Sequence, residues 1–272
     1  MLKLFIMSAK SHIQNIKYNG YTIFRNSIKK KDIKKYLFKV KELYNQNKII
    51  NSNQSNNQKK DKYVYHLQSK DIIFWELIKK SAQLDLISKF LNDEFYTNVS
   101  KNYYNFILSY YNARSSVAKL PLHIDNKIPY IGSKPIAMQM IISLSGQQKN
   151  NGATFVVPGS HQSGLLADRK FNDYITVDLK PGDIVIWDSR LWHGAHENTL
   201  KKERWSLVAT FKVWWAKQNF NPIKNINESI YSKLNKQQKL IAGFLSIPPK
   251  NEFDRIVVKQ GFNDLKKKIS DY

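Results

Sequence analysis

Two residues that commonly bind metal ions stand one position apart near the middle of the chain. In the stretch KLPLHIDNKIPY, residues 119–130, His123 and Asp125 are separated only by Ile124. On an extended segment such residues leave the same face, so an imidazole and a carboxylate can converge on one point. This donor pair suits a divalent first-row metal such as Fe(II). The pair also fits a polar contact at the end of a strand, so a metal site needs a further ligand.

A third ligand has to come from the remaining histidines. Besides His123 the chain has five, and three of these lie in the N-terminal third or in a loop-like stretch: His12, His66 and His161. The other two, His193 and His196, follow the apolar run GDIVIWD. Because they are three apart, they cannot share a face of an extended chain, so only one is expected to bind. His193 is the better candidate, since it follows the strand directly and precedes a glycine.

A cationic residue follows the histidine pair at the start of another strand-like run. Arg204 opens RWSLVATFKVWW, eleven residues after His193. The alternation of this run predicts two faces: one apolar, with Trp205, Leu207, Ala209, Phe211 and Val213, and one with Arg204, Ser206, Val208, Thr210 and Lys212. If the second face points into a barrel, the Arg204 guanidinium is buried and needs an anionic partner. A ligand carboxylate would serve, held by a bidentate fork.

The segments that must position these residues are short strands after about residue 96. They are rich in β-branched and aromatic side chains and are separated by turn sequences such as NNG, PGS and KPGD. Many short strands joined by such turns predict a mainly β sandwich or barrel. Helical spacing is expected at 31–44, within 71–92 and at 228–245, with a strand-like run in YNGYTIFRNSI and a polar loop at 45–62.

The composition predicts a globular protein, and a cytoplasmic location without a membrane partner is the default expectation. Of the 272 residues, 42% are hydrophobic and 13% aromatic, enough for a sizeable core. Cysteine is absent, which excludes disulfides and thiolate metal sites. The apolar run in MLKLFIMSAKSH is too short for a secretory signal. No stretch approaches the ~20 apolar residues of a membrane-spanning helix.

The strong positive charge argues less for nucleic acid than it first suggests. The formal net charge is +23, yet only six of the 44 basic residues are arginine, the residue favoured for bidentate phosphate and guanine contacts. Lysine is spread along the chain, which favours a solvated surface. Attraction of an anionic partner or substrate stays open. Arg114 and Lys119, close to the first metal motif, are candidates for such a contact or are simply solvated.

Four motifs follow one another through the middle and second half of the chain: HID at 123–125, NNGATFVVPGSHQSG at 150–164, KPGDIVIWDSRLWHGAHENT at 180–199 and RWSL at 204–207. In this order and at roughly this spacing they resemble the phytanoyl-CoA dioxygenase family of Fe(II)/2-oxoglutarate oxygenases. The resemblance covers about residues 100–215 and extends more loosely to YNGYTIF and QQKLIAGF. It implies one domain over 1–272 with a double-stranded β-helix, or jelly-roll, cupin-like core at about 97–216. A helical N-terminal part at about 1–96 and a helical C-terminal tail at about 217–272 would flank this core.

The resemblance also implies roles for individual residues. His123, Asp125 and His193 match a 2-His-1-carboxylate triad, which binds one face of Fe(II) and leaves positions for a cosubstrate and O2. Arg204 matches the residue that binds the distal carboxylate of 2-oxoglutarate, whose other end chelates the metal. Relatives that halogenate have a small residue in place of Asp125, so its presence favours hydroxylation.

Three further polar residues are less determined by the sequence. Gln139 in AMQMIISL has the same parity as Ile141 and Ser143, so it either points into the barrel toward the cosubstrate or is satisfied within the sheet. Ser206, two positions after Arg204, is a candidate support for the cosubstrate carboxylate. Thr154 is a weaker candidate.

Taken together, the resemblance implies a dioxygenase that hydroxylates a small organic or acyl substrate and releases succinate and CO2. The alternatives are a non-catalytic member that holds a metal or ligand, and a demethylase of nucleic acid or protein. The segments that would decide the substrate, 45–62, 126–136 and 164–175, contain no recognisable motif. The sequence also leaves the oligomeric state open.

Overall fold

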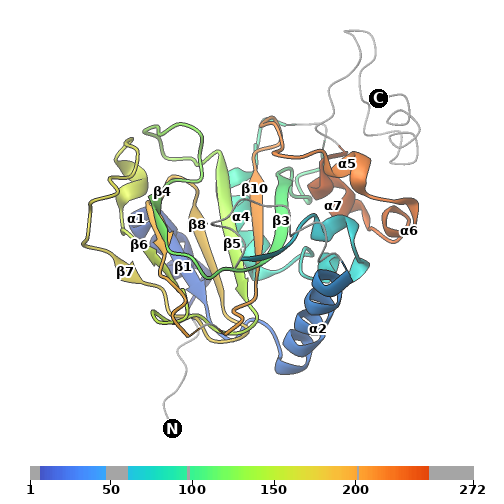
Figure 1. The fold of residues 1–272 in the computed structure, drawn as a ribbon. Helices are drawn as coiled ribbons and strands as arrows, with labels where there is room; N and C mark the ends of the chain where they lie inside the picture. Colours follow the sequence, from blue (N-terminus) through green and yellow to red (C-terminus); the bar gives the residue numbers. More distant parts are fainter. Residues whose placement is uncertain (1–6, 47–60, 97–98, 201, 245–272) are drawn as a thin grey trace.

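Two antiparallel β-sheets face each other in the computed structural model, and helices lie against the larger sheet (Figure 1). The structure describes residues 7–46, 61–96, 99–200 and 202–244. Every pair of neighbouring strands is antiparallel. This jelly-roll arrangement with flanking helices confirms the predicted mainly β fold. The division of the chain near residues 96 and 216 stays a prediction.

The larger sheet has six strands in the order β1-β8-β5-β10-β3-β2. Their bounds are Tyr21–Phe24 (β1), Lys62–Val64 (β2), Ile107–Ser115 (β3), Ala137–Ser143 (β5), Ile184–Asp188 (β8) and Ser206–Lys212 (β10). In the register of the three central strands, Thr210 of β10 lies opposite Gln139 of β5, which lies opposite Trp187 of β8. β5 and β8 are buried along their whole length, because helices cover one face of the sheet and the second sheet faces the other.

The smaller sheet has four strands in the order β4-β9-β6-β7. Their bounds are Leu120–His123 (β4), Thr154–Val156 (β6), Ile175–Thr176 (β7) and His193–Ala195 (β9). His123 of β4 lies directly opposite His193 of β9. Strand pairing therefore brings together two histidines that are seventy residues apart in the sequence.

The N-terminal part forms helices and also contributes to the larger sheet. The helices are α1 (Ala9–Asn19), α2 (Lys30–Gln46), the short 3-10 turns η1 (Leu67–Ser69) and η2 (Ile72–Glu76), and α4 (Ala82–Leu91). The helical stripe predicted at 31–44 is confirmed, since α2 buries Ile33, Tyr36, Val40 and Leu43. β1 pairs with β8 at one edge and β2 with β3 at the other, so this part is not purely helical.

The predicted helix at 228–245 is broken into short pieces. They are α6 (Glu228–Tyr231), α7 (Lys236–Lys239) and the π-helical turn η4 (Leu240–Phe244), preceded by α5 (Pro222–Asn225). Asn235 starts α7 with a capping box to Gln238, and Gly243 takes a φ of 101°, which disfavours other residues. The chain after Phe244 lies outside the described residues, as do residues 47–60 of the expected polar loop. Among the described helices, none is both long and apolar enough to cross a bilayer.

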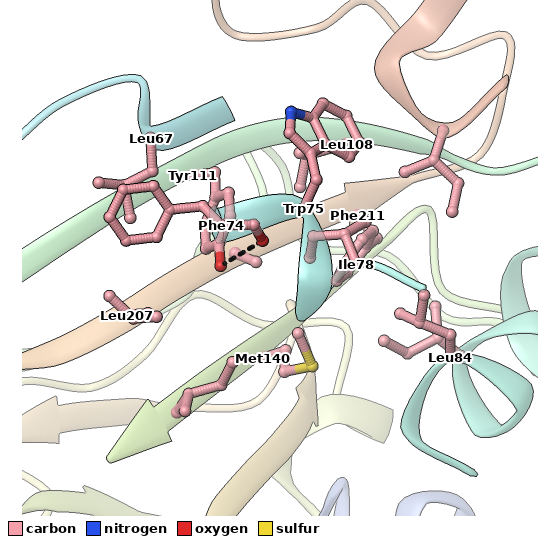
Figure 2. Close-up of a cluster of buried hydrophobic side chains, with 14 of the residues drawn as sticks. Leu67, Phe74, Trp75, Ile78, Leu84, Leu108, Tyr111, Met140, Leu207 and Phe211 are labelled. Carbon is pink, nitrogen blue, oxygen red and sulfur yellow. Dashed lines mark hydrogen bonds between the residues drawn. The ribbon is translucent and has the colours of Figure 1, made fainter. Parts of the chain in front are cut away.

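The main hydrophobic core lies between the helices and the outer face of the larger sheet. Figure 2 shows side chains of η1, η2 and α4 packed against strands β3, β5 and β10. Phe74, Trp75 and Phe211 are almost fully buried there, and the Tyr111 hydroxyl donates to the Phe74 carbonyl at 3.3 Å. The opposite face of the same sheet is left to line the space between the two sheets.

Candidate metal centre

Three potential metal ligands converge between the two sheets. His123 ends β4, Asp125 follows two residues later, and His193 opens β9. Their ligand atoms all lie within 4.8 Å of one another. The Asp125 carboxylate lies 3.8 Å from Nε2 of His123 and 3.4 Å from Nε2 of His193. The three residues that the sequence singled out are thus brought to one point, with the donor types that suit a divalent first-row metal.

Backbone carbonyls fix the orientation of both imidazoles. Nδ1 of His123 lies 2.9 Å from the carbonyl oxygen of Pro121, and Nδ1 of His193 lies 2.9 Å from that of Leu191. Because a carbonyl only accepts, each Nδ1 carries the proton, and each Nε2 presents a lone pair to the centre. Burial lowers the pKa of His123, and the nearby His193 lowers it further. The neutral imidazole, which is the metal-binding form, is therefore favoured.

The smaller sheet can bring the two histidines together because β9 packs closely on its neighbours. A Cβ built at Gly194 would lie 2.6 Å from the carbonyl oxygen of Leu120 and would also overlap the Phe155 ring. Only glycine fits between β4 and β6 at this position. The glycine after His193 is therefore a packing requirement of the site.

The carboxylate of the centre is held by a residue that the sequence analysis did not single out. The indole Nε1 of Trp187, on β8, donates to Oδ2 of Asp125 at 3.2 Å. The backbone N–H of Asp125 also donates to the carbonyl of Ser189 at 2.9 Å. Since a buried tryptophan N–H usually needs an acceptor, the Trp in GDIVIWD carried a usable signal, but its partner could not be read from the sequence.

A cavity of about 400 Å³ contains the triad and continues along the inner face of β10. Arg204, Ser206, Val208, Thr210 and Lys212 all line it, while Trp205, Leu207, Ala209 and Phe211 belong to the core. The two faces predicted from the alternation are confirmed. The face that carries Arg204 is the inner one.

Arg204 is a buried cation without an acidic partner among the described residues. It is 7% exposed, and its Nε is buried with no hydrogen-bond partner there. Burial lowers the pKa of Arg204 to about 10, and the positive charge of Arg114 adds to this effect. A guanidinium that faces a cavity in this state favours binding of a carboxylate.

The less determined candidates also line the cavity and are held by hydrogen bonds. Thr210 Oγ1 donates to Oε1 of Gln139 at 2.6 Å, and Nε2 of Gln147 donates to Oγ of Ser206 at 2.8 Å. Gln139 therefore lines the cavity and also accepts a hydrogen bond from a neighbouring strand. The two alternatives that the sequence left open for this residue are compatible. Thr154 lines the same space. Arg114 lies at its edge and pairs with Asp61 at 3.7 Å.

The other histidines in the chain do not reach the centre. His196 turns to the far side of β9, where its Nε2 lies 2.9 Å from Oγ1 of Thr176. His161 contacts the carbonyl of Lys17, and His12 bonds to Thr22. The prediction that only one of His193 and His196 belongs to the metal centre agrees with these positions.

Comparison with known protein families places most of the chain in one family. Residues 16–206 match the model of the family described as Phytanoyl-CoA dioxygenase (PhyH). "Dioxygenase af480" of Aspergillus fumigatus is 25% identical over 177 residues, which cover 63% of this chain and 53% of the relative. "Uncharacterized protein Rv1501" of Mycobacterium tuberculosis is 25% identical over 112 residues, 40% of this chain and 41% of the relative. The chain spans about half or less of the length of these relatives.

Solved structures with a similar fold include enzymes that use 2-oxoglutarate. The non-heme alpha ketoglutarate dependent epimerase SnoN from nogalamycin biosynthesis superposes with a TM-score of 0.57 at 19% identity, over 76% of this chain and 83% of SnoN. HygX from Streptomyces hygroscopicus, with nickel and 2-oxoglutarate bound, gives 0.61 at 13% identity over 78% and 90%. HygX has also been solved with hygromycin B. At these identities the likeness shows a shared fold.

Proposed function

The chain belongs to the phytanoyl-CoA dioxygenase family, and we propose that it is an Fe(II)- and 2-oxoglutarate-dependent dioxygenase that hydroxylates a small organic substrate. One observation carries the proposal: a His-Asp-His cluster and a buried arginine that has no acidic partner in the described part of the chain line the same cavity. The first could hold a divalent metal, and the second could bind a carboxylate. A 2-oxo dicarboxylic acid has one end for each.

The donor set fits Fe(II). His123 and His193 would bind it through Nε2 and Asp125 through its carboxylate, an arrangement that leaves other coordination positions free. With 2-oxoglutarate and O2, iron at such a site supplies oxidation of a C–H bond, with succinate and CO2 as products. The carbonyls of Pro121 and Leu191 keep both imidazoles in the metal-binding tautomer.

Residues along β10 and β5 would orient the cosubstrate. Arg204 would bind its distal carboxylate, and Ser206 lies on the same face two residues along the strand. Gln139 lines the same cavity, and because its Oε1 accepts from Thr210, its amide N–H groups would be available to the cosubstrate. Gln147 holds Ser206 and Thr210 holds Gln139 before any ligand arrives, so these two side chains lose little entropy on binding.

Asp125 bears on the kind of product. A carboxylate at this position occupies a coordination site that a halide would need, so hydroxylation is favoured over halogenation. The Trp187 indole holds this carboxylate in place. The small-molecule ligand of the similarly folded HygX supports a small-molecule substrate.

The first test is spectroscopic and needs no substrate. Anaerobic addition of Fe(II) and 2-oxoglutarate to the protein is expected to give a weak visible metal-to-ligand charge-transfer band. His193→Ala should remove the band, because a ligand is lost, whereas His196→Ala should keep it, because that ring faces Thr176. The two variants remove the same side chain three residues apart and control for each other.

The outcomes separate the rival functions. If the wild-type protein gives no band, the chain is a non-catalytic member of the fold. If His193→Ala retains it, the proposed metal centre is wrong. When the band forms, succinate release from 2-oxoglutarate over a panel of small organic acids, esters and amines identifies a substrate by its rise above uncoupled turnover. If a methylated oligonucleotide or peptide gives the highest succinate release, the alternative function as a demethylase is supported.

A further inference from the structure

The charges that line the cavity do not balance, even after the proposed ligands are placed. Four of the lining residues are cations: Arg114, Lys127, Arg204 and Lys212. Within the described part of the chain, Asp125 is the only acid that lines the cavity, and the metal would bind it. Arg114 is paired with Asp61, and Arg204 would take the cosubstrate carboxylate. The charges of Fe(II), doubly charged 2-oxoglutarate, Asp125 and Arg204 then sum to zero. Among the residues that the structure describes, nothing supplies a counter-charge for the two lysines.

The position of Lys212 separates it from the cosubstrate end of the cavity. Thr210 is at the level of the metal centre, because it lies opposite Gln139, which lies opposite Trp187, the donor to Asp125. Lys212 is one inward-facing position further along β10, about 7 Å in an extended strand. Arg204 lies in the other direction from Thr210. Lys212 is therefore on the side of the centre where a substrate, and not 2-oxoglutarate, would lie.

Lys127 reaches the same end of the cavity from a different element. The N–H groups of Asp125 and Asn126 donate to the carbonyl of Ser189, and the N–H of Ser189 donates to that of Ala137. Ala137 is the register partner of Lys212. These bonds bring the loop after β4 beside the end of β10, and Lys127 is the next residue in that loop.

The Lys212 ammonium is held in place. Its Nζ donates to the carbonyl oxygen of Lys217 at 3.0 Å and to Oδ1 of Asn219 at 2.5 Å. Burial lowers the pKa of Lys212, and the positive charge of Lys127 lowers it further. A third donor direction of the ammonium remains for a ligand. The walls nearby include Tyr110, Ile128, Ile136 and Ala216, which suit an apolar or aromatic substrate body.

We infer that Lys127 and Lys212 form an anion-binding subsite, so that the substrate carries a carboxylate or phosphate group close to the carbon that reacts. This inference rests on the proposed function and narrows its substrate class. An anionic group bound there would neutralise the remaining charge and fix the substrate's orientation beside the metal centre. The apolar wall would hold the rest of the molecule.

The test compares three probes of equal chain length: hexanoate, hexyl phosphate and the neutral hexanamide. Each is titrated into the protein loaded anaerobically with Fe(II) and 2-oxoglutarate, and binding is followed by the change in the charge-transfer band. At least one anion is expected to bind about tenfold or more tightly than hexanamide, since a charge-assisted hydrogen bond is gained. Preference for hexanoate indicates a carboxylate substrate, and preference for hexyl phosphate a phosphorylated one.

Lysine variants show whether the preference comes from this subsite. Lys212→Met and Lys127→Met should each reduce it, and Lys212→Arg should keep it. Lys134→Met is the matched control: Lys134 lies in the same loop but pairs with Glu94 and does not line the cavity. It removes the same charge and should leave the preference intact.

Several outcomes would overturn the subsite without touching the proposed function. One is equal binding of all three probes, and another is failure of both anions to bind. A third is an anion preference that persists in both methionine variants, which would indicate direct coordination of the anion to iron. In each case the charge-transfer band of the loaded protein still forms, so the iron and 2-oxoglutarate site stands. Lys127 is exposed, so Lys127→Met should leave the charge-transfer band intact. Loss of the band in this variant would contradict the separation between the 2-oxoglutarate end and the lysine end of the cavity.

Discussion

The two faces of β10 place stability and chemistry on opposite sides of one strand. On the outer face, Trp205, Leu207, Ala209 and Phe211 are all 0% exposed and pack against helices and neighbouring strands. On the inner face, Arg204, Ser206, Thr210 and Lys212 line the cavity. These outer side chains belong to the main hydrophobic core. The inner face carries the buried guanidinium of Arg204 and the half-buried ammonium of Lys212. Among the described residues, the only carboxylate in the cavity wall is that of Asp125, the proposed metal ligand.

This contrast teaches that the inner face is built for ligands at a cost in stability. Burial of an unpaired cation disfavours folding, and the lowered pKa of Arg204 expresses that cost. Core packing on the outer face offsets it. Substitutions on the inner face should therefore mainly reduce ligand binding and turnover. Substitutions on the outer face should mainly reduce the free energy of unfolding.

The largest effect is expected at the cavity side, from removal of the acidic ligand. Asp125→Ala should lower succinate release to the level of the metal-free protein, because only two histidines remain to hold the metal. The free energy of unfolding should fall only by the cost of leaving the Trp187 N–H without its acceptor, about 1–3 kcal/mol. Asp168→Ala removes a carboxylate from an exposed loop position and should leave turnover unchanged. Full turnover in Asp125→Ala would place the metal centre elsewhere.

On the core face, Phe211→Ala should reduce the free energy of unfolding by about 3–5 kcal/mol. Phe211 is fully buried and makes an edge-to-face contact with Phe106 at a centroid distance of 5.4 Å. Urea denaturation gives the value. The charge-transfer band should persist below the transition, and a loss of 2-oxoglutarate affinity in the folded variant would break the proposed separation of the two faces.

Arg204→Met should show the reverse pattern. Without the guanidinium, affinity for 2-oxoglutarate should fall at least about thirtyfold, or about 2 kcal/mol. The free energy of unfolding at neutral pH should rise, because the folded-state pKa lies below the usual value, so protonation opposes folding at any pH under that pKa. This gain should shrink as the pH approaches and passes about 10. A drop in stability would mean that Arg204 has a structural partner.

The smallest effect is expected from the indole that orients Asp125. Trp187→Phe keeps an aromatic side chain of smaller size but removes the 3.2 Å hydrogen bond, and metal affinity should fall roughly tenfold. Fe(II) titration with 2-oxoglutarate present measures it. Trp192→Phe is the matched control, because that indole donates to the Leu165 carbonyl outside the cavity. Equal effects of the two substitutions would assign the loss to packing.

The sequence by itself predicted the candidate residues of the site and the two faces of β10. The triad and Arg204 followed from ligand types, spacing and family resemblance, and strand parity is a local property, since successive side chains leave opposite faces. For the same reason the helical stripe of α2 could be predicted. The break in the helix predicted at 228–245 could not, because competing caps and tertiary packing decide where short helices end.

Only the tertiary structure decided which distant residues meet. Trp187 forms a hydrogen bond with Asp125, Thr210 forms one with Gln139, and Lys127 lies beside the end of β10. Each contact depends on the register of strands that are far apart in the chain. Register depends on the whole set of paired strands and on the loops between them, which local patterns do not specify. The candidate metal ligands could therefore be predicted from the sequence, whereas the residues that orient them and the subsite proposed for the substrate could be identified only in the folded chain.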